Sequence, residues 1–458
     1  MQHILIANRA AIAVRAAQTC RGLGLRTTAL AARTDTQAAA HVAAADHEVT
    51  VEGRGLPDTY DSAARVLDAV DRSGVDAVYP GYGSLAENAD FVAGLEERGV
   101  TFVGPSAAAL RLAGSKAAAA EAARRIGVPV LPHATGRGRD EVLAHVHAMG
   151  LPVVLKPEFG YGGQAVRVAR TEADVERAVA GSPEAAGGTE AAGTSWYIEK
   201  YLPVNQVVGV TLAVDHDGNV LPLGERESLL VADGLKLLEA SPVAGVDAQV
   251  LEAMRADAAL VAREFGLTNV MTVEFIVGPD RYYFLEVNGR LPLAYRMSES
   301  QLGTYSGARS GTDSGARSGA VPGARSGADS GTPPGADLVE LQLRIARGES
   351  VSAAAHPVDR TRHCLEARLF VHPQELADFP DVGTLDRFEL PDVDGVTYAR
   401  SVDPERPVTY ELILAQALAA DTSRAAAARL VRKAVDGARV TGLRCYVEEI
   451  TWRLDDEC

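Results

Sequence analysis

The first hundred residues alternate between short apolar runs and stretches of helical periodicity. Apolar runs at residues 3–7 and 25–31 flank a helical pattern at residues 10–22, and later runs at 76–79 and 100–103 each follow a helical segment. This alternation predicts βαβ units and a parallel sheet of Rossmann-like layout. No Gly-x-Gly-x-x-Gly motif follows the first run, so the pattern does not indicate a dinucleotide site.

The length of the chain predicts more than one domain. A chain of 458 residues is too long for one ordinary core and suggests two to four packed domains. Its hydrophobic content of 47% and charged content of 23% are typical of soluble globular proteins. A net charge of −16 argues against a nucleic-acid partner, because binding to phosphate backbones depends on clustered Lys and Arg. No apolar run is long enough for a spanning helix, so no membrane association is expected.

The four cysteines, Cys20, Cys364, Cys445 and Cys458, lie far apart in the sequence. No Cys-x-x-Cys pair or Cys/His cluster with zinc spacing occurs, so a structural zinc site is not expected. Polar residues interrupt the apolar start of the chain, which therefore does not match a signal peptide. Reduced thiols in a cytoplasmic protein are the expectation.

A lysine and three glycines follow an apolar run at residues 151–156. Lys156 ends this run, and the next segment contains Gly160, Gly162 and Gly163. An ammonium at a strand end beside a glycine loop can bind phosphate oxygens that backbone N–H groups also cover. A lysine that extends from a strand end to water is the commoner case for such a residue taken alone. No Gly-x-x-x-x-Gly-Lys-Ser/Thr motif occurs, which excludes a P-loop.

An expected hairpin carries the most informative acidic pair. Apolar strands at residues 271–276 and 282–287 flank a turn around Asp280, so Glu274 and Glu286, symmetric about that residue, should face each other. Asn288 and Arg290 should share a face with Glu286 because side chains alternate along a strand. Facing carboxylates repel unless a cation lies between them, and hard oxygen ligands suit Mg²⁺. The hairpin alone fits a magnesium site and a solvated polar face equally well.

The later part of the chain contains a low-complexity segment at residues 303–334. Gly-Ala-Arg-Ser-Gly recurs there at Gly307, Gly315 and Gly323, and almost nothing in it could enter a core. We therefore expect a disordered insertion. Helical patterns follow at residues 337–346, with Asp337 as the N-cap, and at residues 424–435.

Seven ordered segments together resemble biotin carboxylases. They are residues 4–9 (Ile-Leu-Ile-Ala-Asn-Arg) with Ile12-Ala13, 80–88 (Pro-Gly-Tyr-Gly-Ser-Leu-Ala-Glu-Asn), 102–105 (Phe-Val-Gly-Pro), 114–116 (Gly-Ser-Lys), 199–202 (Glu-Lys-Tyr-Leu), 225–226 (Glu-Arg) and 284–290 (Phe-Leu-Glu-Val-Asn-Gly-Arg). The segment at 80–88 is the most specific. The resemblance covers nearly the whole chain except the insertion.

The resemblance implies an α/β and α+β multidomain protein of the ATP-grasp class. Residues 1–112 would form a Rossmann-like pre-ATP-grasp domain, and residues 113–302 an ATP-grasp domain with a mobile lid at about 130–202. Residues 335–458 would complete the ATP-grasp core and form a C-terminal barrel-like domain. A homodimer through the N- and C-terminal domains is expected by resemblance only.

The resemblance also implies site residues, with ATP and Mg²⁺ (or Mn²⁺) as the bound species. Those that would bind the nucleotide are Lys116, Lys156, Gly160, Gly162, Gly163, Glu199, Lys200, Leu202 and Ile276. Glu274 and Glu286 would ligate the metal, with Asn288 beside them. Lys236 and Arg290 match positions that bind bicarbonate, and Arg368 matches the arginine that stabilises the biotin enolate.

Several positions depart from the family pattern. Ala294 stands where the family keeps the glutamate proposed to deprotonate bicarbonate, and a methyl group cannot accept a proton. Pro292 replaces a glutamine ligand, and Val207 occupies a histidine position. Val231 and Gly234 lie in a run where the family has Gln and His, and the lid loop has Tyr161 and Gln164 in place of glycine and arginine. The chain has no biotin attachment segment, so no covalent biotin is expected in it.

The departures affect the bicarbonate and biotin positions, whereas the ATP and metal positions are retained. We therefore predict an ADP-forming ligase that activates a carboxylate as an acyl phosphate and transfers it to a nucleophile, an amine, and that is not a standard biotin carboxylase. The apolar side chains Val207, Val231, Leu293 and Ala294 would suit a bulkier acid than bicarbonate. Two alternatives remain: a non-catalytic ATP-binding partner subunit, and a carboxylase with a non-biotin acceptor. Lys236, Arg290 and Arg368 favour an enzyme.

Overall fold

The computed structural model describes residues 1–159, 166–180, 195–203, 206–279, 281–302, 336–354, 357–376, 379 and 381–458. The predictions for the lid residues Gly160, Tyr161, Gly162, Gly163 and Gln164 lie outside these described residues. The insertion predicted at 303–334 lies outside them too.

The N-terminal part is a five-stranded parallel sheet with the order β3-β2-β1-β4-β5, as the alternating pattern predicts. Its strands are β1 (His3–Ile6), β2 (Arg26–Ala32), β3 (His47–Val51), β4 (Ala77–Tyr79) and β5 (Thr101–Phe102). The helices that connect them are α1 (Ala10–Gly22), α2 (Ala39–Ala44), α3 (Ala63–Ser73) and α4 (Ala89–Glu97), with short 3-10 turns η1 (Leu56–Asp58) and η2 (Ser84–Glu87). Ile4 and Leu5 belong to different core clusters because neighbouring side chains point to opposite faces, so the sheet is buried on both sides.

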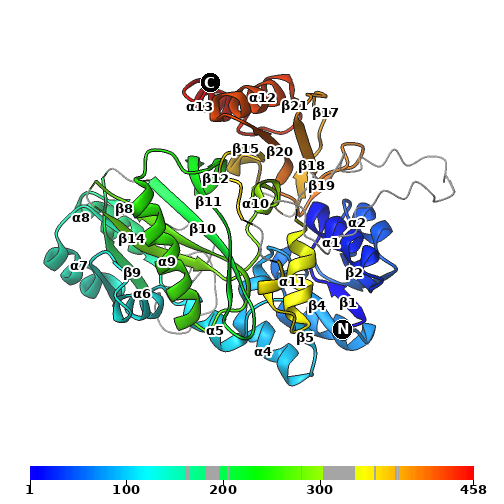
Figure 1. Cartoon of the computed structure of the whole chain (residues 1–458), viewed down its shortest axis with the longest axis horizontal. Coiled ribbons are helices and arrows are strands. Elements are labelled where there is room, and N and C mark those ends of the chain that lie inside the picture. The colour runs from blue at the N-terminus through cyan, green and yellow to red at the C-terminus, as the bar shows by residue number, and fades with distance from the viewer. Residues whose placement is uncertain are drawn as a thin grey trace.

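An antiparallel sheet of eight strands forms the centre of the molecule, in the order β14-β13-β10-β11-β12-β15-β20-β18 (Figure 1). In chain order the strands are β10 (Gln206–Val214), β11 (Val220–Ala232), β12 (Leu235–Ser241), β13 (Asn269–Val277), β14 (Tyr282–Asn288), β15 (His363–Phe370), β18 (Val396–Arg400) and β20 (Ile413–Asp421). Strands that precede and follow the insertion therefore lie in one continuous sheet. Helix α9 (Ala248–Glu264) packs its apolar side on the β10 and β13 strands, and Glu274 lies on the opposite face of β13.

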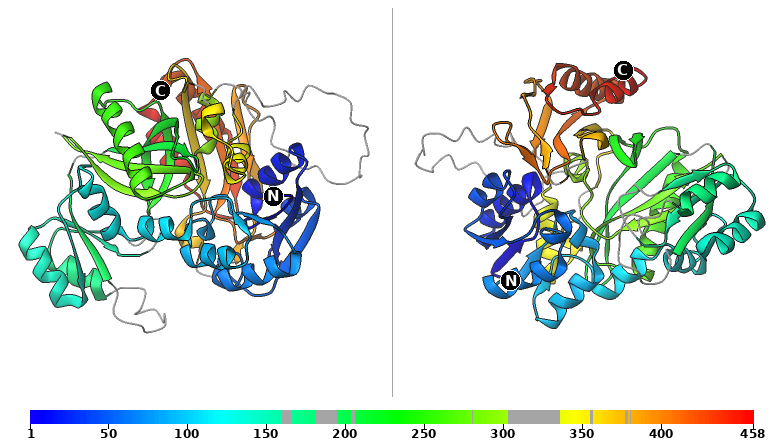
Figure 2. Two further views of the ribbon diagram at one scale, coloured as in Figure 1. Left: turned by 60° about the horizontal axis from the view of Figure 1, so that its bottom comes forward. Right: turned by 180° about the vertical axis from the view of Figure 1, so that it is seen from behind.

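The segment predicted as the lid, at about residues 130–202, contains a separate four-stranded sheet with the order β6-β9-β7-β8. It consists of β6 (His133–Arg137), β7 (Val153–Pro157), β8 (Arg167–Ala169) and β9 (Ser195–Lys200), with the helices α7 (Gly138–Met149) and α8 (Glu172–Ala180). Its apolar side chains form a core of their own, and the unit projects from the rest of the protein (Figure 2). Helices α5 (Ala107–Gly114) and α6 (Lys116–Arg125) connect the N-terminal sheet to it.

The remaining C-terminal elements complete the fold around the central sheet. They are α10 (Tyr295–Gln301), α11 (Leu338–Ala346), η4 (Val351–Ala354), η5 (Pro373–Leu376), β16 (Asp381–Gly383), β17 (Arg387–Glu389), β19 (Val408–Thr409), α12 (Arg424–Gly437), β21 (Arg439–Thr441) and α13 (Val447–Asp455). The predicted helices after residue 336 and near residue 424 are confirmed, and Asp337 caps α11 through bonds from the backbone N–H groups of Val339 and Glu340. In the described part of the chain, no helix combines the length and hydropathy needed to cross a membrane.

Candidate nucleotide and metal site

Glu274 and Glu286 are direct cross-strand partners on β13 and β14, as predicted. The pairing depends on a β-bulge. Next to the turn, Phe275 pairs with Phe284, and a regular ladder would then place Leu285 opposite Glu274. Leu285 is instead the extra residue of the bulge, which moves Glu286 into register with Glu274.

Strand β10, beside this pair, leaves space for the buried side chain of Arg226. Gly209 on β10 is the cross-strand partner of Glu274 and also of Arg226 on β11. A Cβ at Gly209 would lie 3.0 Å from Thr272 Cγ2 and 3.4 Å from Arg226 Cζ, so glycine leaves space for the guanidinium. Arg226 donates to Thr211 Oγ1 at 2.6 Å and to Glu239 Oε1 at 3.1 Å.

Two of the three predicted catalytic cations contact this hairpin. Lys236 donates a hydrogen bond from Nζ to Glu274 Oε1. Arg290 donates from Nη2 to Asn288 Oδ1 at 3.0 Å, and Asn288 Nδ2 lies 3.4 Å from Glu286 Oε1. The side chains of Lys236 and Arg290 are 29% and 21% exposed, so both cations can reach a ligand.

The hairpin fits a magnesium ion that is coordinated partly by the protein and partly by the phosphates of a nucleotide. Glu274 and Glu286 supply two carboxylates side by side, and hard oxygen donors of this kind suit Mg²⁺. Among the described residues, no group of three or more His, Cys, Asp or Glu side chains is placed to hold a metal alone. Two carboxylates leave most of an octahedral shell for phosphate oxygens and water, which is the usual arrangement for Mg²⁺ at a nucleotide.

Lys156 is not a lysine that extends to solvent. It lies on β7 and is largely buried, and its Nζ donates to Glu199 Oε2 on β9 at 2.8 Å. Lys116 is the first residue of α6, after the N-cap Ser115. Burial lowers the pKa of Lys116; the carboxylate of Glu286 opposes this shift and the ammonium of Lys156 adds to it. Lys116 therefore lies close enough to Glu286 and Lys156 to interact with them electrostatically.

Glu158 links the two segments that carry these lysines, and it was not predicted. Its Oε1 accepts hydrogen bonds from Ser115 Oγ at 2.7 Å and from Ala117 N at 3.1 Å, at the N-terminus of α6. The end of β7 is thereby fixed to the start of α6, where a carboxylate is favoured by the helix dipole. Nothing in the sequence indicates that this strand and this helix meet.

The predicted nucleotide-binding residues Lys200 and Leu202 lie at the end of β9, where the chain leaves the four-stranded sheet. Lys200 donates from Nζ to the Gly150 carbonyl at 2.8 Å, within the lid. Leu202 packs beside the end of β13, because a Cβ at Gly278 would lie 3.0 Å from Leu202 Cδ2. Ile276 lies two residues before Gly278 and is the cross-strand partner of Val207. Leu202 and Ile276 therefore lie at the same end of the central sheet.

Arg368 differs from the other two predicted catalytic residues because it is only 2% exposed. It donates to Glu366 Oε1 at 2.9 Å, to the Lys236 carbonyl at 3.0 Å and to Glu239 Oε2. Burial by itself would raise the pKa of Glu239, but the nearby charges of Arg368, Arg226 and Lys236 outweigh it and hold the pKa at about 2. In this structure Arg368 therefore supports the backbone of Lys236 from inside the protein.

The apolar surface predicted from four substitutions is only partly present. Ala294 is 1% exposed and packs with Met297, Cys364 and Leu418, so it lines no surface. Leu293 packs against the core of the C-terminal part. Val231, by contrast, is 51% exposed and is the cross-strand partner of Lys236. The prediction was wrong for Ala294 because helix α10 turns its first residues into the core.

Gly234 has a structural role in the β11–β12 connection. It follows Asp233 in a two-residue turn where both residues have positive φ, +49° for Asp233 and +79° for Gly234. Turns of this kind favour glycine because a Cβ is strained there. This position therefore provides a turn and no side chain for a ligand.

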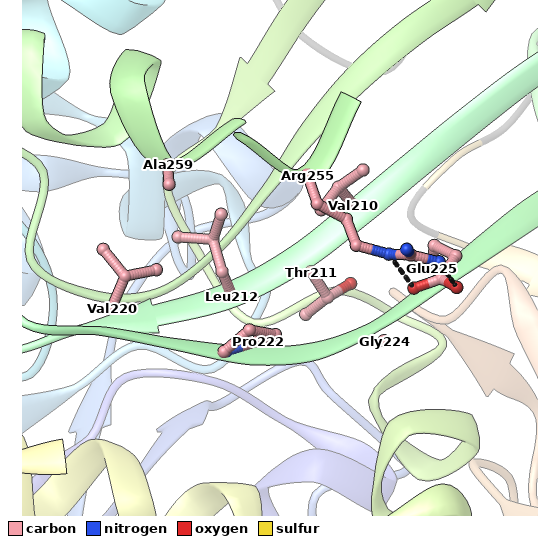
Figure 3. A pocket seen from close by; sticks show the side chains of 9 residues that line it. All are labelled: Val210, Thr211, Leu212, Val220, Pro222, Gly224, Glu225, Arg255 and Ala259. Carbon is pink, nitrogen blue, oxygen red and sulfur yellow. Dashed lines mark hydrogen bonds and ion pairs between the residues drawn. The ribbon is translucent and has the colours of Figure 1, made fainter. Parts of the chain in front are cut away.

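A small cavity of about 50 Å³ lies between β10, β11 and α9 (Figure 3). It is lined by Val210, Thr211, Leu212, Val220, Pro222, Gly224, Glu225, Arg255 and Ala259. Arg255 Nη2 donates to Glu225 Oε1 at 2.6 Å at one end. The cavity includes neither Glu274 nor Glu286, and it is too small for a nucleotide, so it is separate from the site on the hairpin.

Family models match most of the chain. Residues 1–110 match the biotin carboxylase N-terminal domain, and residues 115–304 match the ATP-binding domain of the carbamoyl-phosphate synthase L chain. The chain is 30% identical over 453 residues to biotin carboxylase 1 of Bacillus subtilis (strain 168), covering 98% of this chain and 93% of the relative. It is 31% identical over 450 residues to the biotin carboxylase of Halalkalibacterium halodurans, covering 97% of this chain and 92% of the relative.

Solved structures show the same similarity. The biotin carboxylase domain dimer of Hydrogenobacter thermophilus 2-oxoglutarate carboxylase, in complex with MgADP, ADP and bicarbonate, has a TM-score of 0.82 and 26% identity to this chain. The match covers 100% of this chain and 94% of that one. The biotin carboxylase domain of a single-chain bacterial carboxylase has a TM-score of 0.75 and 27% identity, over 99% of this chain and 93% of that one.

Proposed function

The chain belongs to the biotin carboxylase family, and from this premise we propose that it is an ATP-dependent, ADP-forming ligase with an altered acid or acceptor. It activates a carboxylate as an acyl phosphate and transfers the acyl group to an amine. The observation that carries the proposal is the contrast between two parts of one site. The Glu274–Glu286 pair is flanked by accessible Lys236 and Arg290, whereas the position of the family's proposed base is a buried alanine, Ala294.

The first chemical step needs charge neutralisation more than acid–base groups. A carboxylate oxygen attacks the γ-phosphorus of ATP, the bond to the β–γ bridging oxygen breaks, and ADP leaves. Lys116 and Lys156 bind the phosphates, and Arg290 holds the carboxylate as charge develops on the transferred group. Bound Mg²⁺, held by Glu274 and Glu286, would supply further charge neutralisation on the phosphates.

The second step needs a nucleophile that does not depend on a carboxylate at position 294. An amine attacks the acyl carbon, phosphate leaves, and the amine proton passes to phosphate or water. Val231 supports an acid with a hydrocarbon substituent, because its exposed apolar side chain lies beside Lys236 across the β11–β12 ladder. The related dimer with MgADP and bicarbonate supports ATP and Mg²⁺ as the ligands here, and a homodimer as the assembly.

Lys236 and Arg290 also favour a second candidate, a carboxylase that uses bicarbonate with a non-biotin acceptor. Both cations keep the positions that match bicarbonate ligands, and both are accessible. This candidate shares the first step and differs only in the acid.

The test is ADP release from Mg·ATP with a panel of acids. The panel contains bicarbonate, bicarbonate with free biotin, and aliphatic and amino carboxylic acids, each with and without an amine. We expect ADP release that requires one acid and is stimulated by an amine. Stimulation by biotin with bicarbonate would show that the standard reaction is retained. Tight ATP binding with no turnover on any acid would instead indicate a non-catalytic partner subunit.

A further inference from the structure

Glu87 joins the N-terminal domain to Arg290 through two hydrogen bonds. Its Oε1 accepts from Gly289 N at 3.0 Å, and its Oε2 accepts from Arg290 Nε at 2.8 Å. We propose that Glu87 is a positioning residue that fixes the guanidinium of Arg290 for the acyl phosphate. The proposal rests on the function proposed above only for the identity of the ligand.

The fold holds Glu87 rigidly from the N-terminal side. Asn8 Nδ2 donates to the Pro80 carbonyl at 2.7 Å, which fixes the start of the 80–88 segment. Gly81 has a φ of +59°, and a Cβ there would lie 2.9 Å from Ile12 Cγ1, so the segment lies close against α1. Glu87 then ends η2, directly after buried apolar residues.

On the hairpin side, the backbone at Gly289 packs closely against helix α5. A Cβ at Gly289 would lie 2.9 Å from Leu110 Cδ2, so glycine allows the backbone to approach α5. This approach brings the N–H of Gly289 to Glu87. One carboxylate therefore fixes both a backbone group and the adjacent side chain, as a two-point contact.

The contacts of Arg290 define which N–H groups remain for a ligand. Nε donates to Glu87, Nη2 to Asn288 Oδ1 at 3.0 Å and Nη1 to the Leu291 carbonyl at 3.3 Å. A guanidinium has five N–H groups in one plane, so two have no contact with the described residues beyond these three. Glu87 also gives Arg290 an anionic partner, without which the arginine would be attracted to the metal carboxylate Glu286 beside Asn288.

The test compares Glu87→Gln with the matched control Glu96→Gln. Glu96 belongs to the same domain and also accepts a backbone N–H bond, from Ala107 at 3.0 Å. In ¹⁵N-arginine NMR, the Nε–H resonance of Arg290 is assigned by its absence in Arg290→Lys. We expect Glu87→Gln to move this resonance and to speed its solvent exchange at least tenfold, and Glu96→Gln to leave both unchanged.

A binding measurement tests the consequence for the ligand. Phosphonoacetate, in which a methylene replaces the anhydride oxygen of carboxy phosphate, the acyl phosphate that bicarbonate forms, is titrated in the presence of MgADP. We expect Glu87→Gln to weaken phosphonoacetate binding at least tenfold while ADP affinity stays within twofold. Glu87→Gln/Arg290→Lys should bind no more weakly than Arg290→Lys, because Glu87 acts through Arg290.

Two results would overturn the proposal. One is an Arg290 resonance that is the same in Glu87→Gln and the wild type, and the other is additive losses in the double variant. If the wild type does not bind phosphonoacetate, the candidate that uses bicarbonate loses support, and the Arg290 resonance alone decides the positioning role. If Glu87→Gln does not fold, Glu87→Asp is used in its place. Glu87→Asp keeps the charge on a shorter side chain, and we expect it to move the Arg290 Nε–H resonance in the same way.

Discussion

The ammonium of Lys156 lies 2.8 Å from Glu199 Oε2, and both side chains are almost completely buried in the lid. The two residues lie on the neighbouring strands β7 and β9 and also border the predicted ATP site. The pair therefore stabilises the lid sheet and at the same time sets the direction of a predicted phosphate ligand.

Removing one member of this pair should destabilise the lid. Lys156→Met leaves the Glu199 carboxylate buried without its cation, and we expect a loss of about 3–5 kcal/mol. Lys156→Met/Glu199→Leu should recover much of this loss because no charge remains buried. Urea unfolding followed by the fluorescence of Trp196 in the lid measures both variants. If the free energy of unfolding of Lys156→Met lies within about 1 kcal/mol of the wild-type value, the pairing is contradicted.

Glu286→Gln should weaken the metal site without unfolding the protein. The amide keeps the size of the side chain but loses the charge opposite Glu274, so we expect Mn²⁺ binding in the presence of ADP to weaken at least tenfold. Electron paramagnetic resonance of free Mn²⁺ measures this affinity. Glu252→Gln, at an exposed carboxylate on α9, is the control and should bind as the wild type does. Equal affinities in the two variants would refute the metal assignment.

Glu299 should make stability depend on pH. Burial raises its pKa from 4.5 to about 7, although Arg15 and Arg296 oppose the shift, and Asp337 adds to it. The folded protein therefore favours the protonated acid. The stabilisation that protonated Glu299 contributes is complete below pH 4.5 and is lost as the pH rises through about 7.

Glu299→Gln should remove this dependence because it cannot ionise. Between pH 4.5 and 8, we expect the unfolding free energy of the variant to rise relative to the wild type by about 3 kcal/mol, from a shift of 2.5 units (7 − 4.5). Other shifted carboxylates are present in both proteins, so the difference isolates Glu299. Chemical denaturation across this pH range provides the measurement, and parallel curves would disprove the assignment.

Restoring the family's glutamate at position 294 should destabilise the protein. Ala294 packs with Met297, Cys364 and Leu418, so Ala294→Glu would introduce a buried carboxylate and excess volume, at a cost of about 3 kcal/mol or more. Ala294→Gln separates size from charge: it should show the packing loss with the same pH dependence as the wild type. Thermal unfolding at pH 5 and 8 tests this. A stable Ala294→Glu variant with biotin-dependent carboxylation would contradict the prediction.

Local patterns predicted the elements well because strand and helix periodicity depends on neighbouring residues. The parallel pairing of the first sheet, the cap Asp337 and the hairpin of β13 and β14 are confirmed. Motifs in order along the chain predicted the family, which the comparisons confirm. The facing of Glu274 and Glu286 was right, but through a bulge at Leu285 that residue counting does not detect.

Contacts between distant segments could not be predicted in this way. Glu87 meets Arg290, and Glu158 meets the start of α6, only because separate elements pack against each other. Ala294 looked like part of a substrate surface and is buried, since its helix packs into the core.

The sequence by itself indicated which charged groups are available here: Glu274 and Glu286, facing each other across one hairpin, Arg290 just after it, and Lys116 and Lys156 from two other segments. Only the tertiary structure decided how these groups are held. Arg368 is enclosed by Glu239 and Glu366, whereas Arg290 stays accessible with Glu87 behind it. The physical reason is that the protonation, direction and accessibility of a charged side chain depend on burial and on its ionic partners, and those come from segments far apart in the chain.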